Sequence, residues 1–167
     1  MIDVAAVTPL VAPLAEALRG RGWRLATAES CTGGLIAAAC TALAGSSDWF
    51  DRGFVAYSDA AKREQLGVDA GLIAAHGAVS GEVARAMAAG ALARSGADIA
   101  VAVTGIAGPG GAAPGKPVGT VWLALAMRGS QVQAERLQLA GERASVRAQT
   151  VAIALQRLLH AVPGAGP

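Results

Sequence analysis

The chain has 167 residues, of which 53% are hydrophobic and 16% charged, so it can bury the core of one domain. Aromatic residues make up only 4%, and the core must therefore come from Ala, Val, Leu and Ile. Basic and acidic residues nearly balance, 14 against 12, which argues against a nucleic-acid partner. No uninterrupted apolar run approaches the ~20 residues that cross a bilayer, so no membrane association is expected.

We expect one domain over residues 1–162 and a flexible tail over residues 163–167. The N-terminal segment lacks the basic stretch of a signal peptide. Cys31 and Cys40 have no Cys or His partner at metal-binding spacing, which is typical of a reduced, cytoplasmic protein. The alanine-rich, apolar composition also favours a homo-oligomer.

Helix and strand patterns alternate along the first half of the chain. Leu10, Leu14 and Leu18 recur at four-residue spacing and predict a first helix that ends near Gly20. The segments that follow are a buried strand, a sharp turn, a helix, a second strand and a helix closed by Gly67, over residues 23–28, 29–34, 35–43, 53–57 and 58–66.

The second half adds a helix and three strands. Ser80 caps a predicted long helix to about Arg94, after a shorter helical segment that ends at His76. Strands are predicted over 98–104, 118–127 and 132–139, with a Gly/Pro loop over 105–117 and a last helix over 143–160. This order predicts an α/β fold, a three-layer α/β/α sandwich with a mixed, mostly parallel sheet.

The turn Glu-Ser-Cys-Thr-Gly-Gly at residues 29–34 is the first candidate for chemistry. A strand, a tight turn and a helix place Ser30 at the carboxyl end of the strand, beside the backbone N–H groups of Thr32, Gly33 and Gly34. Such donors can hold an oxyanion or a phosphate. The alternative is that Ser30 only caps the helix. The segment is not a G-x-S-x-G elbow, which disfavours an α/β-hydrolase.

Lys62 is the second candidate. It lies early in a helix that follows Tyr57 and the capping Ser58, and both the helix dipole and partial burial lower the pKa of a lysine there. Ser30 and Lys62 both follow carboxyl ends of strands, where open α/β sheets bind ligands. We therefore expect a serine nucleophile with a lysine base, against the alternative of an ordinary exposed lysine.

Two further segments are suited to binding an anion. The loop that begins at Thr104 and Gly105 follows an apolar strand and exposes backbone N–H groups. Residues 110–116 match G-x-x-x-x-G-K, but Pro117 stands where a Walker motif needs Ser or Thr. Arginines at positions 143 and 147 share one helix face and suit a phosphate clamp. A mobile loop and two solvated arginines are the alternatives.

Histidine and metal chemistry find little support. His76 and His160 lie near predicted helix ends and are interpreted as structural or solvated residues, which disfavours a histidine-based triad. His, Cys and carboxylate residues nowhere share the spacing of metal ligands, so no metal is expected.

Seven segments, taken together and in order, resemble one family: residues 28–34, 45–47, 57–62, 77–80, 104–109, 116–119 and 141–147. They are similar to the CinA C-terminal domain, or PncC, family of nicotinamide-nucleotide amidohydrolases, over about residues 10–160. The resemblance implies a three-layer fold and hydrolysis of nicotinamide mononucleotide to nicotinic acid mononucleotide and ammonia, in pyridine-nucleotide salvage. It also implies a Ser/Lys mechanism, for which no metal or organic cofactor is expected. The implied partner is this small-molecule substrate.

By this resemblance Ser30 matches the nucleophile and Lys62 the general base, and Tyr57 is expected as a third catalytic residue. The other expected site positions are Glu29, Thr32, Gly33, Gly34, Ser47, Thr104, Gly105 and either Arg143 or Arg147, facing the phosphate.

The sequence departs from the family pattern at two positions. Asp59 stands where the family usually has Asn, and Glu142 where it usually has Asp. A carboxylate at Asp59 would favour the protonated form of Lys62. The large N-terminal domain of full-length CinA proteins is absent, so the chain resembles the stand-alone form. A non-catalytic nucleotide-binding or sensor module, and an amidohydrolase of another amide nucleotide, stay open as alternatives.

Overall fold

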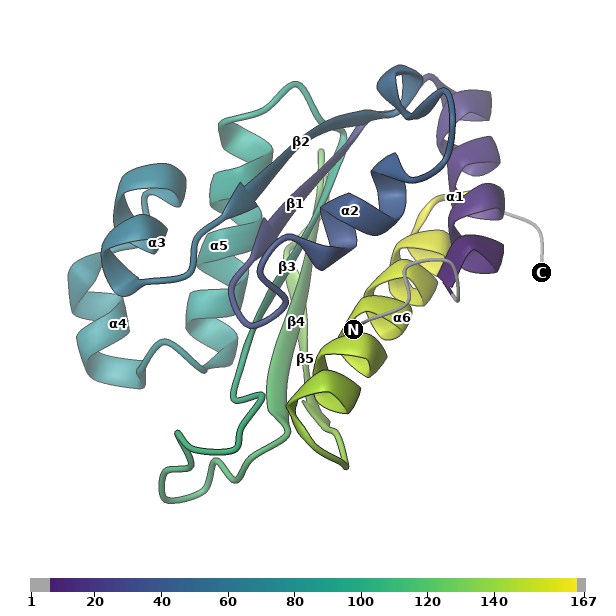
Figure 1. The fold of residues 1–167 in the computed structure, drawn as a ribbon. Coiled ribbons are helices and arrows are strands. Elements are labelled where there is room, and N and C mark those ends of the chain that lie inside the picture. The colour runs from purple at the N-terminus through teal and green to yellow at the C-terminus, as the bar shows by residue number, and fades with distance from the viewer. Residues whose placement is uncertain (1–6, 165–167) are drawn as a thin grey trace.

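A computed structural model describes residues 7–164 (Figure 1). Residues 1–6 of the expected domain and 165–167 of the expected tail lie outside the described residues. The elements in chain order are α1 (Thr8–Arg21), β1 (Leu25–Glu29), α2 (Leu35–Thr41), the short 3-10 helix η2 (Ser46–Asp48), β2 (Phe50–Val55), α3 (Asp59–Leu66), α4 (Ala70–His76), α5 (Gly81–Ala93), β3 (Ile99–Gly105), β4 (Thr120–Met127), β5 (Gln133–Gln138) and α6 (Arg143–Ala161).

The strands form one five-stranded sheet in the order β2-β1-β3-β4-β5. β1 is parallel to both β2 and β3, whereas β4 is antiparallel to β3 and β5 is antiparallel to β4. Only β4 therefore runs against the other strands, which confirms a mixed, mostly parallel sheet. Glu29 pairs with Val55 on one side and Val103 on the other, so β1, β2 and β3 end together at one edge, here called the carboxyl edge.

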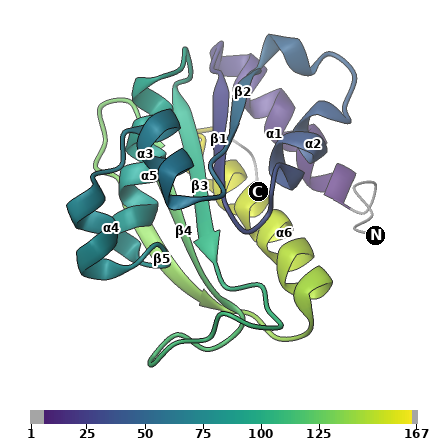
Figure 2. The same cartoon turned by 60° about the vertical axis from the view of Figure 1, so that its left-hand side comes forward.

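Helices cover both faces of the sheet, as Figures 1 and 2 show, and the three-layer sandwich is confirmed. On one face, α1, α2 and α6 pack against large strand side chains: Leu25, Ile99, Val101, Val103 and Leu123. On the other face, α5 and α3 cover the strands and α4 packs against α5. The buried apolar side chains of the strands on this face are all alanine: Ala26, Ala28, Ala100, Ala102, Ala124 and Ala126. The apolar core under α5 is therefore built from small side chains on the sheet.

Local capping signals set the ends of the helices on the α5 side. The Ser58 hydroxyl accepts a hydrogen bond from the N–H of Ala61 at the start of α3, and Gly67, with φ 68°, ends that helix. Ser80 caps α5 in the same way, through the N–H of Val83. A side chain that the prediction did not use, Asp69, caps α4, of which the sequence indicated only the end at His76.

The second strand differs from its predicted position. β2 begins at Phe50 and ends at Val55, whereas the pattern predicted residues 53–57. β2 is an edge strand, so its polar Asp51 and Arg52 lie partly in solvent and hide the apolar pattern. As a result Tyr57 lies in the connection between β2 and α3 rather than at the end of a strand.

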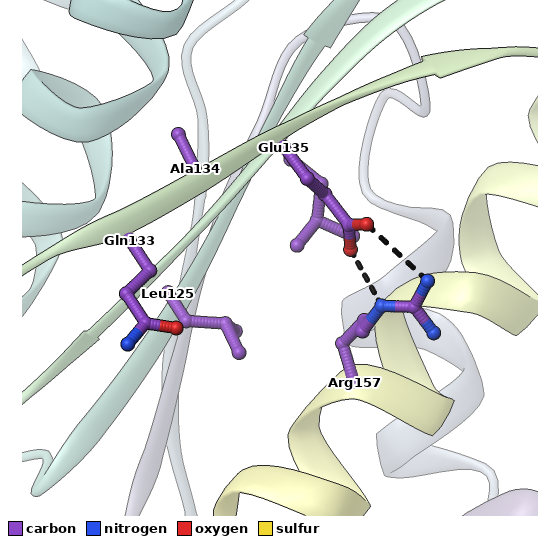
Figure 3. A pocket seen from close by; sticks show the side chains of 6 residues that line it. Leu125, Gln133, Ala134, Glu135 and Arg157 are labelled. Atoms are coloured by element: carbon purple, nitrogen blue, oxygen red, sulfur yellow. Dashed lines mark hydrogen bonds and ion pairs between the residues drawn. The ribbon is translucent and has the colours of Figure 1, made fainter.

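An ion pair joins α6 to the edge strand β5. Arg157 donates from Nε and Nη2 to the two carboxylate oxygens of Glu135, at 2.6 and 3.2 Å (Figure 3). The pair borders a cavity of about 240 Å³ whose other lining residues are Leu123, Leu125, Gln133 and Ala134. None of these residues lines the cavity beside Ser30 described below. Between residues 7 and 164, no helix is both long enough and apolar enough to span a membrane.

Candidate active site

Ser30 and Lys62 meet at the carboxyl edge of the sheet. Ser30 follows β1 directly, and α3 carries Lys62 back toward it, so that Lys62 Nζ lies 3.2 Å from Ser30 Oγ. Nζ also donates to the main-chain carbonyl of Tyr57 at 3.0 Å. Both side chains are buried, with exposed fractions of 8% for Ser30 and 2% for Lys62. A hydroxyl and an amine at this distance form the pair that proton transfer needs.

Burial and a neighbouring carboxylate act in opposite directions on the pKa of Lys62. Removal from water lowers the pKa of its ammonium group below the ordinary value, because the charged form loses hydration. The carboxylate of Asp59 lies 3.8 Å from Nζ and opposes this effect by raising the same pKa. Burial is the larger influence, so the site favours a neutral amine more than water does.

A cavity of about 220 Å³ opens beside the Ser30–Lys62 pair. Five segments that are distant in sequence line it: the turn after β1, the β2–α3 connection with the start of α3, the α4–α5 turn, the end of β3 with the loop after it, and the start of α6. The lining residues are Ser30, Cys31, Tyr57, Asp59, Lys62, Ala78, Val79, Thr104, Gly105, Ala107 and Arg143.

Thr104 and Gly105 hold one wall of this cavity. The Thr104 hydroxyl donates to the carbonyl of Ala78 at 2.8 Å and so ties β3 to the α4–α5 turn. A Cβ at Gly105 would lie 2.9 Å from the carbonyl oxygen of Thr120, so glycine permits the close approach of β4. Both predicted positions therefore lie at the cavity, with the Thr104 hydroxyl committed to the fold.

The two predicted phosphate-binding arginines have different surroundings. Arg143 lines the cavity mouth, where Nη1 donates to the carbonyl of Gly108 at 3.0 Å and Nη2 to the Tyr57 hydroxyl at 3.3 Å. Arg147 lies one turn further along α6 and donates from Nη2 to the carbonyl of Thr32 at 2.9 Å. Arg147 does not line the cavity, so only Arg143 is placed to reach a bound molecule.

The turn of residues 30–34, here called the serine turn, is bonded internally. The N–H of Gly33 donates to the carbonyl of Ser30 at 3.1 Å, and the N–H of Gly34 donates to the Glu29 carboxylate at 3.1 Å. The Thr32 hydroxyl also donates to Glu29. The expectation that the N–H groups of Gly33 and Gly34 face an oxyanion is therefore corrected, because both are already engaged.

Six predicted site residues do not line the cavity. Five of them lie in or beside the serine turn: Glu29, Thr32, Gly33, Gly34 and Arg147. The sixth, Ser47, lies elsewhere in the fold. It belongs to η2, which precedes β2 and so lies at the opposite edge of the sheet from Ser30. Its carbonyl accepts a hydrogen bond from Arg24 Nη2 at 3.3 Å.

Cys31, Ala78, Val79 and Ala107 line the cavity without having been singled out as site residues. All four positions belong to segments that resemble the family, and this was the available signal. Burial raises the pKa of the Cys31 thiol to about 11, so it stays protonated and is no competing nucleophile. Within residues 7–164, His, Cys, Asp and Glu side chains form no group of three that could hold a metal ion.

Fold and site together define a class: an α/β sandwich protein with a buried serine–lysine pair at the carboxyl edge of its parallel strands. Residues 7–162 match the family described as the CinA C-terminal domain. The chain belongs to this family, and the resemblance seen in the sequence is confirmed.

Named relatives extend this assignment. The nicotinamide-nucleotide amidohydrolase PncC of Pseudomonas putida is 55% identical over 154 residues, covering 92% of this chain and 96% of that protein. A CinA-like protein of Mycolicibacterium vanbaalenii is 55% identical over 153 residues, and the chain spans only 36% of its length. The crystal structure of competence damage-inducible protein A (ComA) from Klebsiella pneumoniae superposes with a TM-score of 0.91 at 46% identity, covering 95% of this chain and 98% of that one.

Proposed function

We propose that this protein hydrolyses the carboxamide of nicotinamide mononucleotide to nicotinic acid mononucleotide and ammonia. The observation that carries the proposal is the buried Ser30–Lys62 pair, 3.2 Å apart and open to a cavity. It occurs in a chain that is 55% identical to a Pseudomonas putida protein named nicotinamide-nucleotide amidohydrolase.

The reaction runs in two halves. Neutral Lys62 takes the proton of the Ser30 hydroxyl as Oγ bonds to the carboxamide carbon. The carboxamide oxygen becomes the oxyanion and lies near Gly105 in the cavity wall. Lys62 then gives that proton to the amide nitrogen, the C–N bond breaks, and ammonia leaves an ester on Ser30. Water attacks the ester with Lys62 again as base, which releases the carboxylic acid and restores the serine hydroxyl.

Ammonia release tests the function and the two catalytic roles together. The purified protein is incubated with nicotinamide mononucleotide and EDTA, beside Ser30→Ala, Lys62→Ala and Lys62→Arg. We expect ammonia from the wild-type protein alone, with losses of at least ~10³-fold in the variants. Lys62→Arg keeps a positive charge but removes the base, so wild-type turnover in this variant contradicts the mechanism. Nucleotide binding by all four proteins without ammonia indicates a non-catalytic binding module, and ammonia from a different amide nucleotide alone indicates another substrate.

Arg143 is the residue we assign to the substrate phosphate. Its guanidinium stands at the cavity mouth and has five N–H donors, of which the contacts to Gly108 and Tyr57 leave several for an anion. We expect Arg143→Ala to raise KM at least ~10-fold, which is about 1.4 kcal/mol of binding, with a smaller change in kcat. Arg85→Ala, an exposed arginine on α5, is the matched control. Equal KM values in the two variants would remove Arg143 from the phosphate site.

The cellular setting follows from the same chemistry. The product keeps the ribose phosphate and gains a carboxylate, so we place the reaction in pyridine-nucleotide salvage. The free, buried thiols of Cys31 and Cys40 support a reducing, cytoplasmic compartment. Two exposed apolar side chains, Val55 at the end of the edge strand β2 and Tyr57 just after it, support self-association of the chain.

A further inference from the structure

The Glu29 side chain ends β1 as a fully buried carboxylate with both oxygens engaged. One oxygen accepts the Thr32 hydroxyl at 2.6 Å, the N–H of Gly34 at 3.1 Å and the N–H of Ile36 at 3.0 Å. The other accepts the N–H of Ala37 at 2.9 Å and the Thr27 hydroxyl at 3.3 Å. A buried charge is tolerated only with such a full set of donors.

These bonds satisfy backbone N–H groups at the start of α2. The first N–H groups of a helix have no partner within the helix, and a side chain at the N-cap usually accepts one of them. The N-cap here is Gly34, with φ 95°, which has no side chain and makes no cap bond. Glu29 supplies the acceptor from the neighbouring strand, and its negative charge also suits the positive end of the helix dipole.

Ser30 lies between points that this network fixes. Its own N–H donates to the carbonyl of Val103 at 3.0 Å, so the sheet holds the first residue of the serine turn. On the other side of Ser30, Glu29 binds Thr32 and Gly34. The serine turn therefore has little freedom to move Oγ away from Lys62.

We propose that Glu29 is a positioning residue: its carboxylate fixes the serine turn so that Ser30 stays within reach of Lys62, and it makes no contact with the substrate. The inference rests on the proposed function, since it concerns the same nucleophile. Glu29 does not line the cavity, and its oxygens are filled by protein donors. This replaces the expectation that Glu29 binds substrate.

Glu29→Gln tests the proposal with almost no change in volume. The amide nitrogen cannot accept the bonds made by one carboxylate oxygen, so the turn loosens. A misplacement of about 1 Å at a nucleophile costs about 100-fold, and we expect a loss of this order in kcat with KM within about 2-fold of wild type. The pH at which activity rises, set by Lys62, stays unchanged because Glu29 is not among the groups that shift the Lys62 pKa. A large rise in KM, or a shifted pH profile, would overturn the proposal.

A pair of variants at Thr32 keeps the test valid if Glu29→Gln does not fold. Thr32→Val removes one donor to Glu29 at similar volume, and Thr32→Ser keeps it. We expect kcat to fall about 10-fold in Thr32→Val and to recover in Thr32→Ser. Equal kcat in both variants and in wild type contradicts the proposal.

Amide hydrogen exchange at Gly34, Ile36 and Ala37 supplies a readout that does not depend on activity. Faster exchange in Glu29→Gln or Thr32→Val, with exchange in β4 unchanged, supports a fixed serine turn. Unchanged exchange at these amides overturns it. If wild-type protein releases no ammonia, the proposed function fails on its own, and exchange still decides the role of Glu29.

Discussion

Asp59 influences the pH dependence of this site through the pKa of Lys62. Its carboxylate lies 3.8 Å from Lys62 Nζ and raises the lysine pKa, against the larger, opposite effect of burial. Asp59→Asn removes that opposition, so the Lys62 pKa falls further. The reaction needs the neutral amine, and activity rises as pH passes through this pKa. The rise therefore moves to lower pH in the variant.

A profile of kcat/KM against pH measures this change. Glu64→Gln, an exposed carboxylate on the same helix that does not act on Lys62, is the control and keeps the wild-type profile. A rise that stays in place in Asp59→Asn, or moves to higher pH, shows that Lys62 is not the group that titrates.

The meeting of Ser30 and Lys62 was predictable, because each follows the carboxyl end of one of two strands that proved to be parallel neighbours. The roles of Glu29, Gly33 and Gly34 were not. Spacing shows that a turn has N–H donors, but not which acceptor receives them. The N–H of Gly33 donates to the carbonyl of Ser30, whereas the N–H of Gly34 donates to the side chain of Glu29, whose direction depends on how the strand is paired.

At the scale of elements, α3 and α5 touch through a glycine. A Cβ at Gly90 of α5 would collide with the carbonyl oxygen of Leu66 at the end of α3. Helix propensity alone predicts that Gly90→Ala stabilises the protein by up to ~1 kcal/mol. The clash of the new methyl group with the backbone outweighs this gain, and we expect the free energy of unfolding to fall by about 1–3 kcal/mol.

Gly20→Ala on α1 is the matched control, since its Cβ would meet nothing within 4 Å. Only the helix propensity changes in this variant, and we expect the free energy of unfolding to rise by up to ~1 kcal/mol. Urea unfolding of both variants measures whether the free energy of unfolding rises or falls. The comparison requires that its dependence on urea concentration has the same slope in both variants. A stabilised Gly90→Ala protein would mean that α3 and α5 do not pack this closely.

Helices and strands with clear capping or turn residues were predicted close to their observed bounds. Those without such residues were predicted at shifted positions or only in part. Ser58 and Gly67 mark both ends of α3, which the sequence located closely. β2 was shifted because an edge strand keeps polar residues in solvent. α4 has only 7 residues, too few for an apolar period to define its start.

For the whole molecule, the connections explain the mixed sheet. α2 and η2 lie between β1 and β2, and α3, α4 and α5 lie between β2 and β3. These helical connections allow β2 and β3 to pair in parallel with β1, one on each side. A loop without a helix joins β3 to β4, and a tight turn joins β4 to β5, and both pairs are antiparallel. The strand direction thus changes across the Gly/Pro loop of residues 105–117, which the sequence predicted as a loop.

The contrast between the two faces of the sheet bears on how this protein can diverge. Leucine, isoleucine and valine on the α1 and α6 side exchange with one another at small cost, because their volumes are similar. The alanines under α5 have no such substitute: glycine adds flexibility, and any larger residue lifts α5 and, with it, the helix that carries Lys62. We therefore expect neutral substitutions to accumulate in the core on the α1 and α6 side of the sheet. The alanines on the α5 side are retained because of their volume.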